Sequence, residues 1–284
     1  RFFANPASYF MQKRLGMVLA DKNSLTADRE NFILAALEKY QVEQKLLEAR
    51  LAGLNFAEYK PVLKALGQLP HGKVGEFNFN EMSIEVENFI SKITPFTAKP
   101  SGPRLDMDLN IGKFELSVRL PEITEAGLVS YRYARQRTRD ILTAWIRHLV
   151  LCCQTQPEYP QTSFLICKDS AMTFGPVAAC KPLLENLLGL YLSGLEAPIH
   201  FFPDTSYAYA WHKLKKSASD RTALKKAAKK WQGEEGARKF YKPESDDPCY
   251  DQCYRRMDVL DEEFTKIAMT VFTPLIANSR EIIL

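Results

Sequence analysis

Hydrophobic residues recur at helical spacing over the first 70 residues. Asn5-Pro6-Ala7, followed by apolar positions on one face, predicts a capped helix, because Asn caps helices and Pro suits the first helical turn. A second helical pattern runs over 34–51 and ends at Gly53, and a third predicts a short helix over 56–66. Leu69-Pro70-His71-Gly72 then interrupts the pattern, as expected of a turn.

From about residue 84 to 180 the period changes from helical to alternating. Alternation of apolar and polar side chains is typical of half-buried strands. An apolar stripe around Trp145 predicts a helix. A continuous apolar run over 162–167 predicts a buried strand, and residues 171–174 can pair with it as a neighbouring strand. The predicted order is helix, three strands that read as antiparallel, helix, strand: 84–90, 105–109, 114–120, 128–133, 141–150 and 162–167.

After residue 181 the pattern is helical again, with one more strand predicted over Ile199–Phe202. We therefore expect an α/β protein with an N-terminal helical part (1–83), an α/β core (84–180) and a mostly helical C-terminal part (181–284) packed on that core. The three parts are predicted to form one compact unit.

Composition narrows the class of protein without naming a function. The 284 residues are 46% hydrophobic, enough for a substantial core, and a net charge of +4 is compatible with nucleic acid but not diagnostic. The chain opens on Arg1-Phe2-Phe3, without Met or a leader, so we expect a fragment of a longer protein. Adjacent Cys152-Cys153 in an apolar run, and no disulfide framework, indicate a cytosolic compartment.

Short stretches along nearly the whole chain carry a family resemblance. The order of elements is that of the PD-(D/E)xK, or restriction-endonuclease-like, fold. More specifically, the chain resembles the C-terminal domain of RecC, the gamma subunit of exodeoxyribonuclease V (RecBCD). The matching stretches are weak singly but specific together: Phe2-Phe3-Ala4-Asn5-Pro6 with Arg14-Leu15, 37–41 with 51–53, 69–72, Trp145-Ile146-Arg147-His148-Leu149, 244–248 and Phe272-Thr273-Pro274-Leu275.

The resemblance implies where a nuclease site would lie. Active members of the fold carry an Asp on the second strand and a D/E-x-K on the third, so that carboxylates hold Mg²⁺. Here Arg119 lies near the first position, Ser130 takes the acidic position and Arg132 the lysine position. Two guanidinium groups would repel a divalent cation, so we predict a degenerate, non-catalytic site.

One rival site remains open. Asp106 and Asp108 share a strand face through the period of two, and Glu115 follows on the next strand, so a divergent Mg²⁺-dependent exonuclease is the alternative hypothesis. The competing interpretation is a solvated strand face whose charges discourage edge pairing. No lysine is correctly placed beside these acids, which favours the second interpretation.

Two basic clusters are candidate DNA contacts. The longer cluster is flanked by Tyr207, Tyr209, Trp211 and Trp231, so it could follow a phosphate backbone while aromatics stack on unpaired bases. It could equally be a solvated helical face with inward tryptophans. The shorter cluster follows the third strand, where a nuclease would receive substrate. The candidates are Arg132, Arg135, Arg137 and Arg139, with Lys213, Lys215, Lys216, Arg221, Lys225, Lys226, Lys229 and Lys230.

Other reactive residues do not form a recognisable site. Cys249 and Cys253 lack C-x-x-C spacing, so no iron–sulfur cluster is predicted. The four histidines, His71, His148, His200 and His212, show no metal-ligand spacing, and no Walker-type glycine loop occurs. We therefore expect no metal and no cofactor in this domain. The segment 233–248 is a loop that is either partner-facing or a linker.

The resemblance implies a function in a bacterial, cytoplasmic helicase–nuclease complex that processes double-strand DNA ends for recombinational repair. Its partners would be RecB-type and RecD-type subunits, which use Mg²⁺ and ATP, together with duplex ends and single-stranded DNA. The regions that read Chi would precede this fragment, so no Chi contacts are assigned. We hypothesise that this domain is not an enzyme by itself but a scaffold and DNA guide; a protein-interaction domain without DNA contact is a third option.

Overall fold

The computed structural model describes residues 1–19, 34–97, 104–154, 156, 159–233 and 242–283, and shows a mixed α/β protein. Its helices are η1 (Phe2–Ala4), α1 (Pro6–Arg14), α2 (Ala36–Leu51), α3 (Phe56–Ala65), α4 (Gly72–Thr97), α5 (Thr138–Cys152), α6 (Cys180–Glu196), α7 (Pro203–Lys215), α8 (Asp220–Gln232), η2 (Glu244–Asp246), α9 (Pro248–Tyr254) and α10 (Glu262–Ala277). Its strands are β1 (Asp106–Ile111), β2 (Phe114–Arg119), β3 (Leu128–Arg132), β4 (Ser163–Cys167), β5 (Ala171–Phe174) and β6 (Ser279–Ile282).

Helix starts follow the capping residues in the sequence. The Asn5 side chain accepts a hydrogen bond from the Ser8 amide at 2.9 Å with Pro6 in the first turn, so the predicted capped helix is confirmed as α1. Gly53, at φ +88°, follows the end of α2 in a conformation that suits glycine. The short helix predicted over 84–90 is instead the middle of the 26-residue α4, because the turn at 69–72 ends where that helix begins.

The predicted order of helix, three strands, helix and strand is confirmed, but the strands do not form one sheet. Strands β1 and β2 make an antiparallel hairpin of their own, whereas β3 belongs to a second sheet of order β3-β4-β5-β6. In it β3 and β4 are parallel, and the predicted β4–β5 pairing is antiparallel. The expectation of three consecutive antiparallel strands was therefore wrong for β3, which alternation alone cannot assign to a sheet.

Two further differences lie in the C-terminal part. The strand predicted over Ile199–Phe202 is absent; these buried residues lead into α7 without a strand partner among the described residues. In its place β6, which the pattern did not predict, pairs with β5 and completes the sheet. Residues 199–202 are a buried apolar segment that forms no strand, whereas β6 has the sequence Ser-Arg-Glu-Ile and is only partly buried, so the apolar pattern indicated neither outcome.

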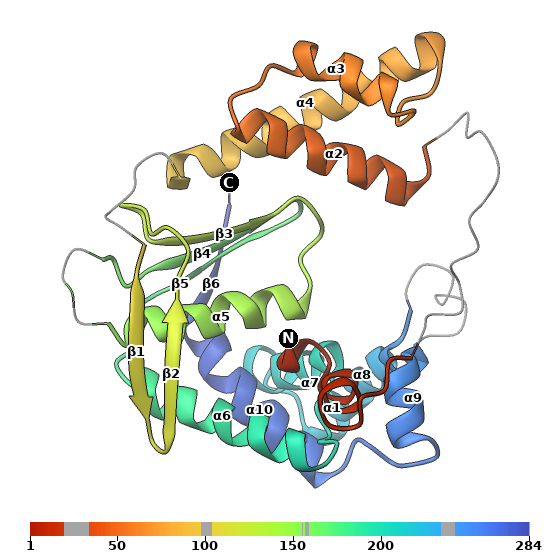
Figure 1. Ribbon diagram of the computed structural model, residues 1–284. Helices are drawn as coiled ribbons and strands as arrows, with labels where there is room; N and C mark the ends of the chain where they lie inside the picture. Colours follow the sequence, from red (N-terminus) through yellow and green to blue (C-terminus); the bar gives the residue numbers. More distant parts are fainter. Residues whose placement is uncertain (20–33, 98–103, 155, 157–158, 234–241, 284) are drawn as a thin grey trace.

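The four-stranded sheet lies between two layers of helices (Figure 1). Leu165, Cys167 and Met172 face α5, α6 and α10, while Ile166 and Ala171 face α2 and α4, as the period of two requires. A third apolar cluster joins α1, α7, α8, α9 and α10. The hairpin packs its apolar side chains on the first core and turns its polar side chains to solvent.

Candidate nucleic-acid interface

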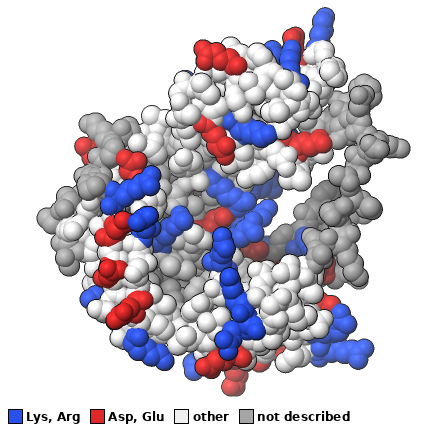
Figure 2. All heavy atoms as spheres, in the orientation of Figure 1, with Lys and Arg blue, Asp and Glu red and all other residues white. Residues whose placement is uncertain are grey.

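A cavity of about 980 Å³ opens between the start of α5, the turn joining β4 to β5, and α7. We call it the basic cleft, since cations from both predicted clusters line it. Figure 2 shows Lys and Arg side chains gathered in a column down the middle of the face that it draws. Its lining comprises Ala4, Arg135, Gln136, Arg137, Thr138, Arg139, Ile141, Asp169, Ser170, Met172, Pro203, Asp204, Tyr207, Ala208, Trp211, His212, Lys230, Lys242, Glu244 and Glu281.

The arginine wall is held in place by hydrogen bonds at its base. The Asp169 carboxylate accepts from the Gln136 amide at 2.8 Å, and Ser170 donates to the Gln136 side chain, so the loop before α5 is tied to the β4–β5 turn. Arg135, Arg137 and Arg139 remain exposed along it. Burial and the neighbouring arginine charges lower the pKa of Arg139, so an anion in the cleft would relieve the repulsion.

The aromatic wall comes from α7. Trp211 and Tyr207 line the cleft with their ring centroids 5.9 Å apart. The other two candidate aromatics are structural: the Tyr209 hydroxyl donates to Asp220 at 2.8 Å, and Trp231 packs against Phe202 with centroids 4.3 Å apart. Of the four aromatics that flank the lysine cluster, two can therefore meet a ligand in this cleft and two cannot.

Acidic residues modulate the charge of the cleft. Glu244 accepts hydrogen bonds from the Asp204 and Thr205 amides, at 3.1 and 2.7 Å, at the N-terminus of α7. Burial, with the nearby Asp204 charge, raises the pKa of Glu244 to about 7 despite those amides. The electrostatic potential of the cleft therefore changes near neutral pH. Glu244 was missed in the sequence, where it belongs to a segment that could be a loop or a linker.

The lysine cluster extends from the cleft over the adjoining helices. Lys230 lines the cleft, and Lys213 pairs with Asp220 at 3.0 Å. The remaining cations of the cluster lie exposed at the end of α7, just after it and along α8: Lys215, Lys216, Arg221, Lys225, Lys226 and Lys229. The structure thus brings one end of this cluster beside the arginines that precede α5, although about 90 residues separate them.

The three predicted degenerate positions do not converge. Arg119 lies on β2, its Nε atom 3.0 Å from the Asp106 carboxylate, in the hairpin. Ser130 and Arg132 lie on β3, in the other sheet. Arg132 is only 24% exposed and pairs with the Asp140 carboxylate at 2.5 Å, so it supports the start of α5 and presents little of its charge to the cleft.

The rival acids are engaged across the hairpin. Asp106 pairs with Arg119, and Asp108 accepts from the Ser117 hydroxyl at 2.7 Å. Glu115 lies opposite Asn110 in the register. Among the described residues, these three carboxylates do not come close enough to share a metal ion. The geometry agrees with a solvated strand face.

His148 is a packing residue in α5. It is fully buried between Trp145 and Phe174, with ring nitrogens 2.8 Å from Ser163 Oγ and 2.7 Å from the Gly175 carbonyl. Burial lowers the pKa of His148 to about 4. Nε2 must donate to the carbonyl, so neutral Nδ1 accepts from Ser163. His148 therefore has a structural role in this environment.

The cysteines described here are free thiols, consistent with the absence of a disulfide framework. Burial raises the pKa of Cys152 to about 11 and that of Cys153 to about 12, so these thiols are protonated and unreactive at neutral pH. Over the described residues, no helix combines the length and apolar character that crossing a membrane requires.

Comparison with known proteins gives a consistent result. The RecC C-terminal domain model matches residues 1–214. The RecBCD enzyme subunit RecC of Escherichia coli (strain K12) is 26% identical over 285 residues, covering 96% of this chain and 25% of the relative. The subunit of Haemophilus influenzae is 26% identical over 62% of this chain and 16% of its own length. That of Buchnera aphidicola subsp. Schizaphis graminum is 23% identical over 99% and 26%. The chain thus spans about a quarter of the E. coli relative.

Proposed function

The chain belongs to the RecC C-terminal domain family, and from this we propose that it is a non-catalytic scaffold and DNA guide in a RecBCD-type complex. The relatives named as RecBCD subunits support a place in the repair of double-strand DNA breaks by homologous recombination. In this proposal the ATP-driven and Mg²⁺-dependent steps belong to the partner subunits, of RecB and RecD type. A restriction-endonuclease-like ancestry remains part of the proposal, supported by the order α4-β1-β2-β3-α5-β4.

The observation that carries the DNA-guide role is the basic cleft. Its exposed arginines and Lys230 can neutralise phosphates, and Trp211 with Tyr207 supplies an aromatic surface on the opposite wall. Phosphate neutralisation gives sequence-independent affinity, and aromatic stacking requires unpaired bases. The combination favours single-stranded over double-stranded DNA.

A pair of double variants tests this role. Exchanging Arg135 and Arg137 for Ala removes two cleft cations, whereas exchanging Lys113 and Arg119 for Ala removes two cations from the hairpin. We expect the first variant to bind labelled oligo-dT about tenfold more weakly at low salt and to lower the salt slope by about 1.4, since each phosphate contact of a single strand contributes about 0.7. Anisotropy titration measures both quantities. Equal losses in the two variants would refute the cleft as the DNA path.

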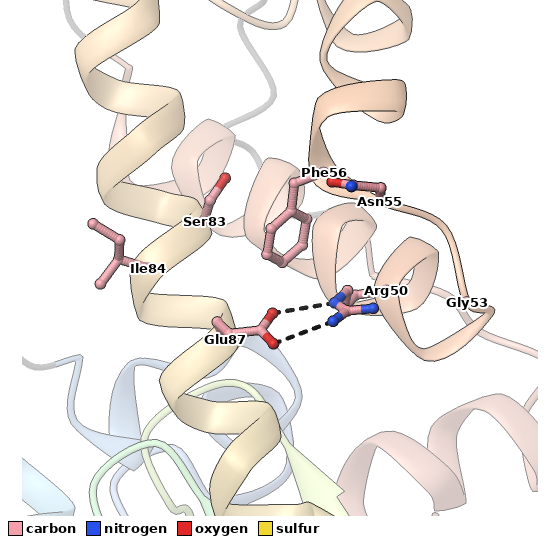
Figure 3. Close-up of a pocket in the computed structure, with 7 residues that line it drawn as sticks. All are labelled: Arg50, Gly53, Asn55, Phe56, Ser83, Ile84 and Glu87. Atoms are coloured by element: carbon pink, nitrogen blue, oxygen red, sulfur yellow. Dashed lines mark hydrogen bonds and ion pairs between the residues drawn. The ribbon is translucent and has the colours of Figure 1, made fainter.

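The scaffold role is supported by the outer surface of the helical layer. Helix α4 buries one apolar stripe against α2 and α3, yet Phe77 and Ile84 on its other side are 64% and 63% exposed. Figure 3 shows a pocket at this surface, in which Phe56 reaches in from α3 while Arg50 and Glu87 face each other. Two hydrogen bonds of 3.2 and 3.4 Å join Arg50 to Glu87 at this pocket of about 500 Å³, whose apolar lining residues are Phe56 and Ile84. Exposed apolar surface of this kind marks protein contacts.

Replacing Phe77 and Ile84 with Ser tests the scaffold role in the assembled complex. We expect the variant to fold normally, because neither side chain is buried, but to lose co-purification with its partner subunits. A matched variant replaces Val18 and Leu37 with Ser. These side chains are 78% and 67% exposed at other places on the surface, so the variant controls for a general loss of exposed apolar area. Full assembly of the Phe77/Ile84 variant would contradict this docking surface.

A further inference from the structure

His200, Asp261 and Glu263 converge at one point of the structure although 61 residues separate the first two. His200 lies just before α7, while Asp261 and Glu263 belong to the start of α10. The ring Nδ1 is 3.0 Å from the Asp261 carboxylate and 3.7 Å from that of Glu263, and all the potential ligand atoms lie within 4.8 Å of one another. Sequence spacing gave no sign of this group.

The two carboxylates cannot both be satisfied by the imidazole. Nδ1 carries one hydrogen, which the 3.0 Å contact directs to Asp261. The 3.7 Å separation to Glu263 is too long for a hydrogen bond. Two carboxylates therefore approach one ring nitrogen that can donate only once, and a cation at their centre would be attracted to both.

The surroundings fix the orientation of the potential ligands. The other oxygen of Asp261 accepts from the Phe264 amide at 2.9 Å as the N-cap of α10. His200 has a side chain only 10% exposed, and its ring lies edge-on to Tyr254 with centroids 5.4 Å apart. Tyr254 is held by its hydroxyl, which donates to the Ile199 carbonyl at 2.7 Å. Such outer contacts orient metal ligands in proteins.

We propose that His200, Asp261 and Glu263 bind a divalent transition metal ion, with Zn²⁺ as the best-fitting candidate. One imidazole and two carboxylates suit Zn²⁺ and Mn²⁺ better than Mg²⁺ or Ca²⁺, which prefer oxygen ligands alone. The separations of 3.0 and 3.7 Å bracket the roughly 3.3 Å between ligands of a tetrahedral zinc ion with bonds of about 2.0 Å. The carboxylate side chains are 41% and 48% exposed, so solvent can supply a fourth ligand.

The ion would join the segment before α7 to the start of α10. Helix α7 forms the aromatic wall of the basic cleft, and it packs against α10. The site thus has a structural consequence, which is to stabilise the position of that wall. No catalytic step is assigned to it.

Zinc titration of the metal-free full chain tests the site. We expect one ion to bind with micromolar affinity or tighter by calorimetry and to raise Tm by about 5 °C at a hundredfold excess over Kd. Mg²⁺ should produce neither effect. Co²⁺ should give the visible absorption of a tetrahedral site with nitrogen and oxygen ligands.

Matched substitutions make the test specific. Glu263→Gln, which breaks no hydrogen bond among the residues that the structure describes, should weaken Zn²⁺ binding at least tenfold, and Asp261→Asn should do the same while Oδ1 still caps α10. Glu262→Gln, one residue away on the same exposed turn, should bind like the unmodified chain. Zinc binding that is absent, or that survives Glu263→Gln unchanged, would overturn the proposal.

Discussion

The basic cleft and the outer face of the β1–β2 hairpin are both rich in charge, yet they differ in how that charge is balanced. On the hairpin, Asp106 faces Arg119 and Asp108 faces Ser117, so opposite or neutral partners meet across the two strands. In the cleft, Arg135 and Arg137 lie on the loop before α5 and Arg139 lies in its first turn, where burial and the charges of Arg137 and Arg132 lower the pKa of Arg139. The charges on the hairpin are already paired and need no ligand, whereas the clustered cations of the cleft would be stabilised by a bound anion.

Two tryptophans provide the largest contrast between a ligand surface and a packed core. Trp211→Ala should weaken single-stranded DNA binding about 5- to 150-fold, because stacking on one base contributes about 1–3 kcal/mol. Trp231→Ala should instead lower the free energy of unfolding by about 3 kcal/mol, because Trp231 packs on Phe202 in the third core. DNA titration and denaturant unfolding of both variants separate the effects. A Trp211 variant with unchanged DNA affinity would remove the aromatic wall from the proposed path.

Substitution of the two arginines at the degenerate positions should have smaller effects, which should differ between Arg132 and Arg119. Arg132→Ala breaks a half-buried pair with Asp140, so we expect a loss of about 1–3 kcal/mol in unfolding free energy. Arg119→Ala breaks a pair whose side chains are 76% and 57% exposed, and should cost less than about 1 kcal/mol. Urea midpoints measure both. Equal losses would mean that the hairpin pair is more than a surface contact.

The sequence predicted local structure better than it predicted the site. Capping at Asn5 and the alternation in β1 and β2 follow from neighbouring residues, so both are confirmed. Membership of β3 in a separate sheet depends on its parallel pairing with β4, more than 30 residues later, which no local pattern encodes. The same applies to β6, whose partner is β5.

The candidate site, too, could be predicted only in part from the sequence. Both basic clusters were visible in the sequence as runs of cations, but their approach in one cleft depends on how α7 packs against α5. Sequence could not separate Trp211 from Trp231, because both flank the same lysines and only the fold decides which ring is packed. His200 was dismissed on spacing, since its two acidic neighbours come from a distant helix.

The cleft should respond to pH near neutrality. With a pKa of about 7, Glu244 is mostly protonated at pH 6 and ionised at pH 8, so single-stranded DNA should bind more tightly at pH 6. Glu244→Gln should bind like the unmodified chain at pH 6 and about two- to fivefold more tightly at pH 8, the effect of one charge at a partly solvated site.

The free energy of unfolding should also decrease as pH rises. A carboxyl whose pKa is raised from 4.5 to about 7 on folding holds its proton in the native state over that interval, so its contribution to the unfolding free energy falls as pH rises through it. Glu244→Gln should remove that part of the pH dependence. Anisotropy and thermal unfolding at several pH values check both effects, and a Gln variant that keeps the full dependence would assign it to other groups.

The smallest effect is expected where the alternative hypothesis places a nuclease. If Asp106, Asp108 and Glu115 held Mg²⁺, then Mg²⁺ or Mn²⁺ would raise Tm, labelled single-stranded DNA would be cleaved, and Asp106→Ala would abolish both. The hairpin geometry predicts none of these results, because Asp106 already pairs with Arg119 and Asp108 with Ser117. Removing the Asp106 carboxylate should change the unfolding free energy by less than about 1 kcal/mol, as for other exposed pairs. Metal-dependent cleavage that is lost in the Asp106 variant would contradict this interpretation, because the hairpin, whose charges are paired, would then carry the catalytic site.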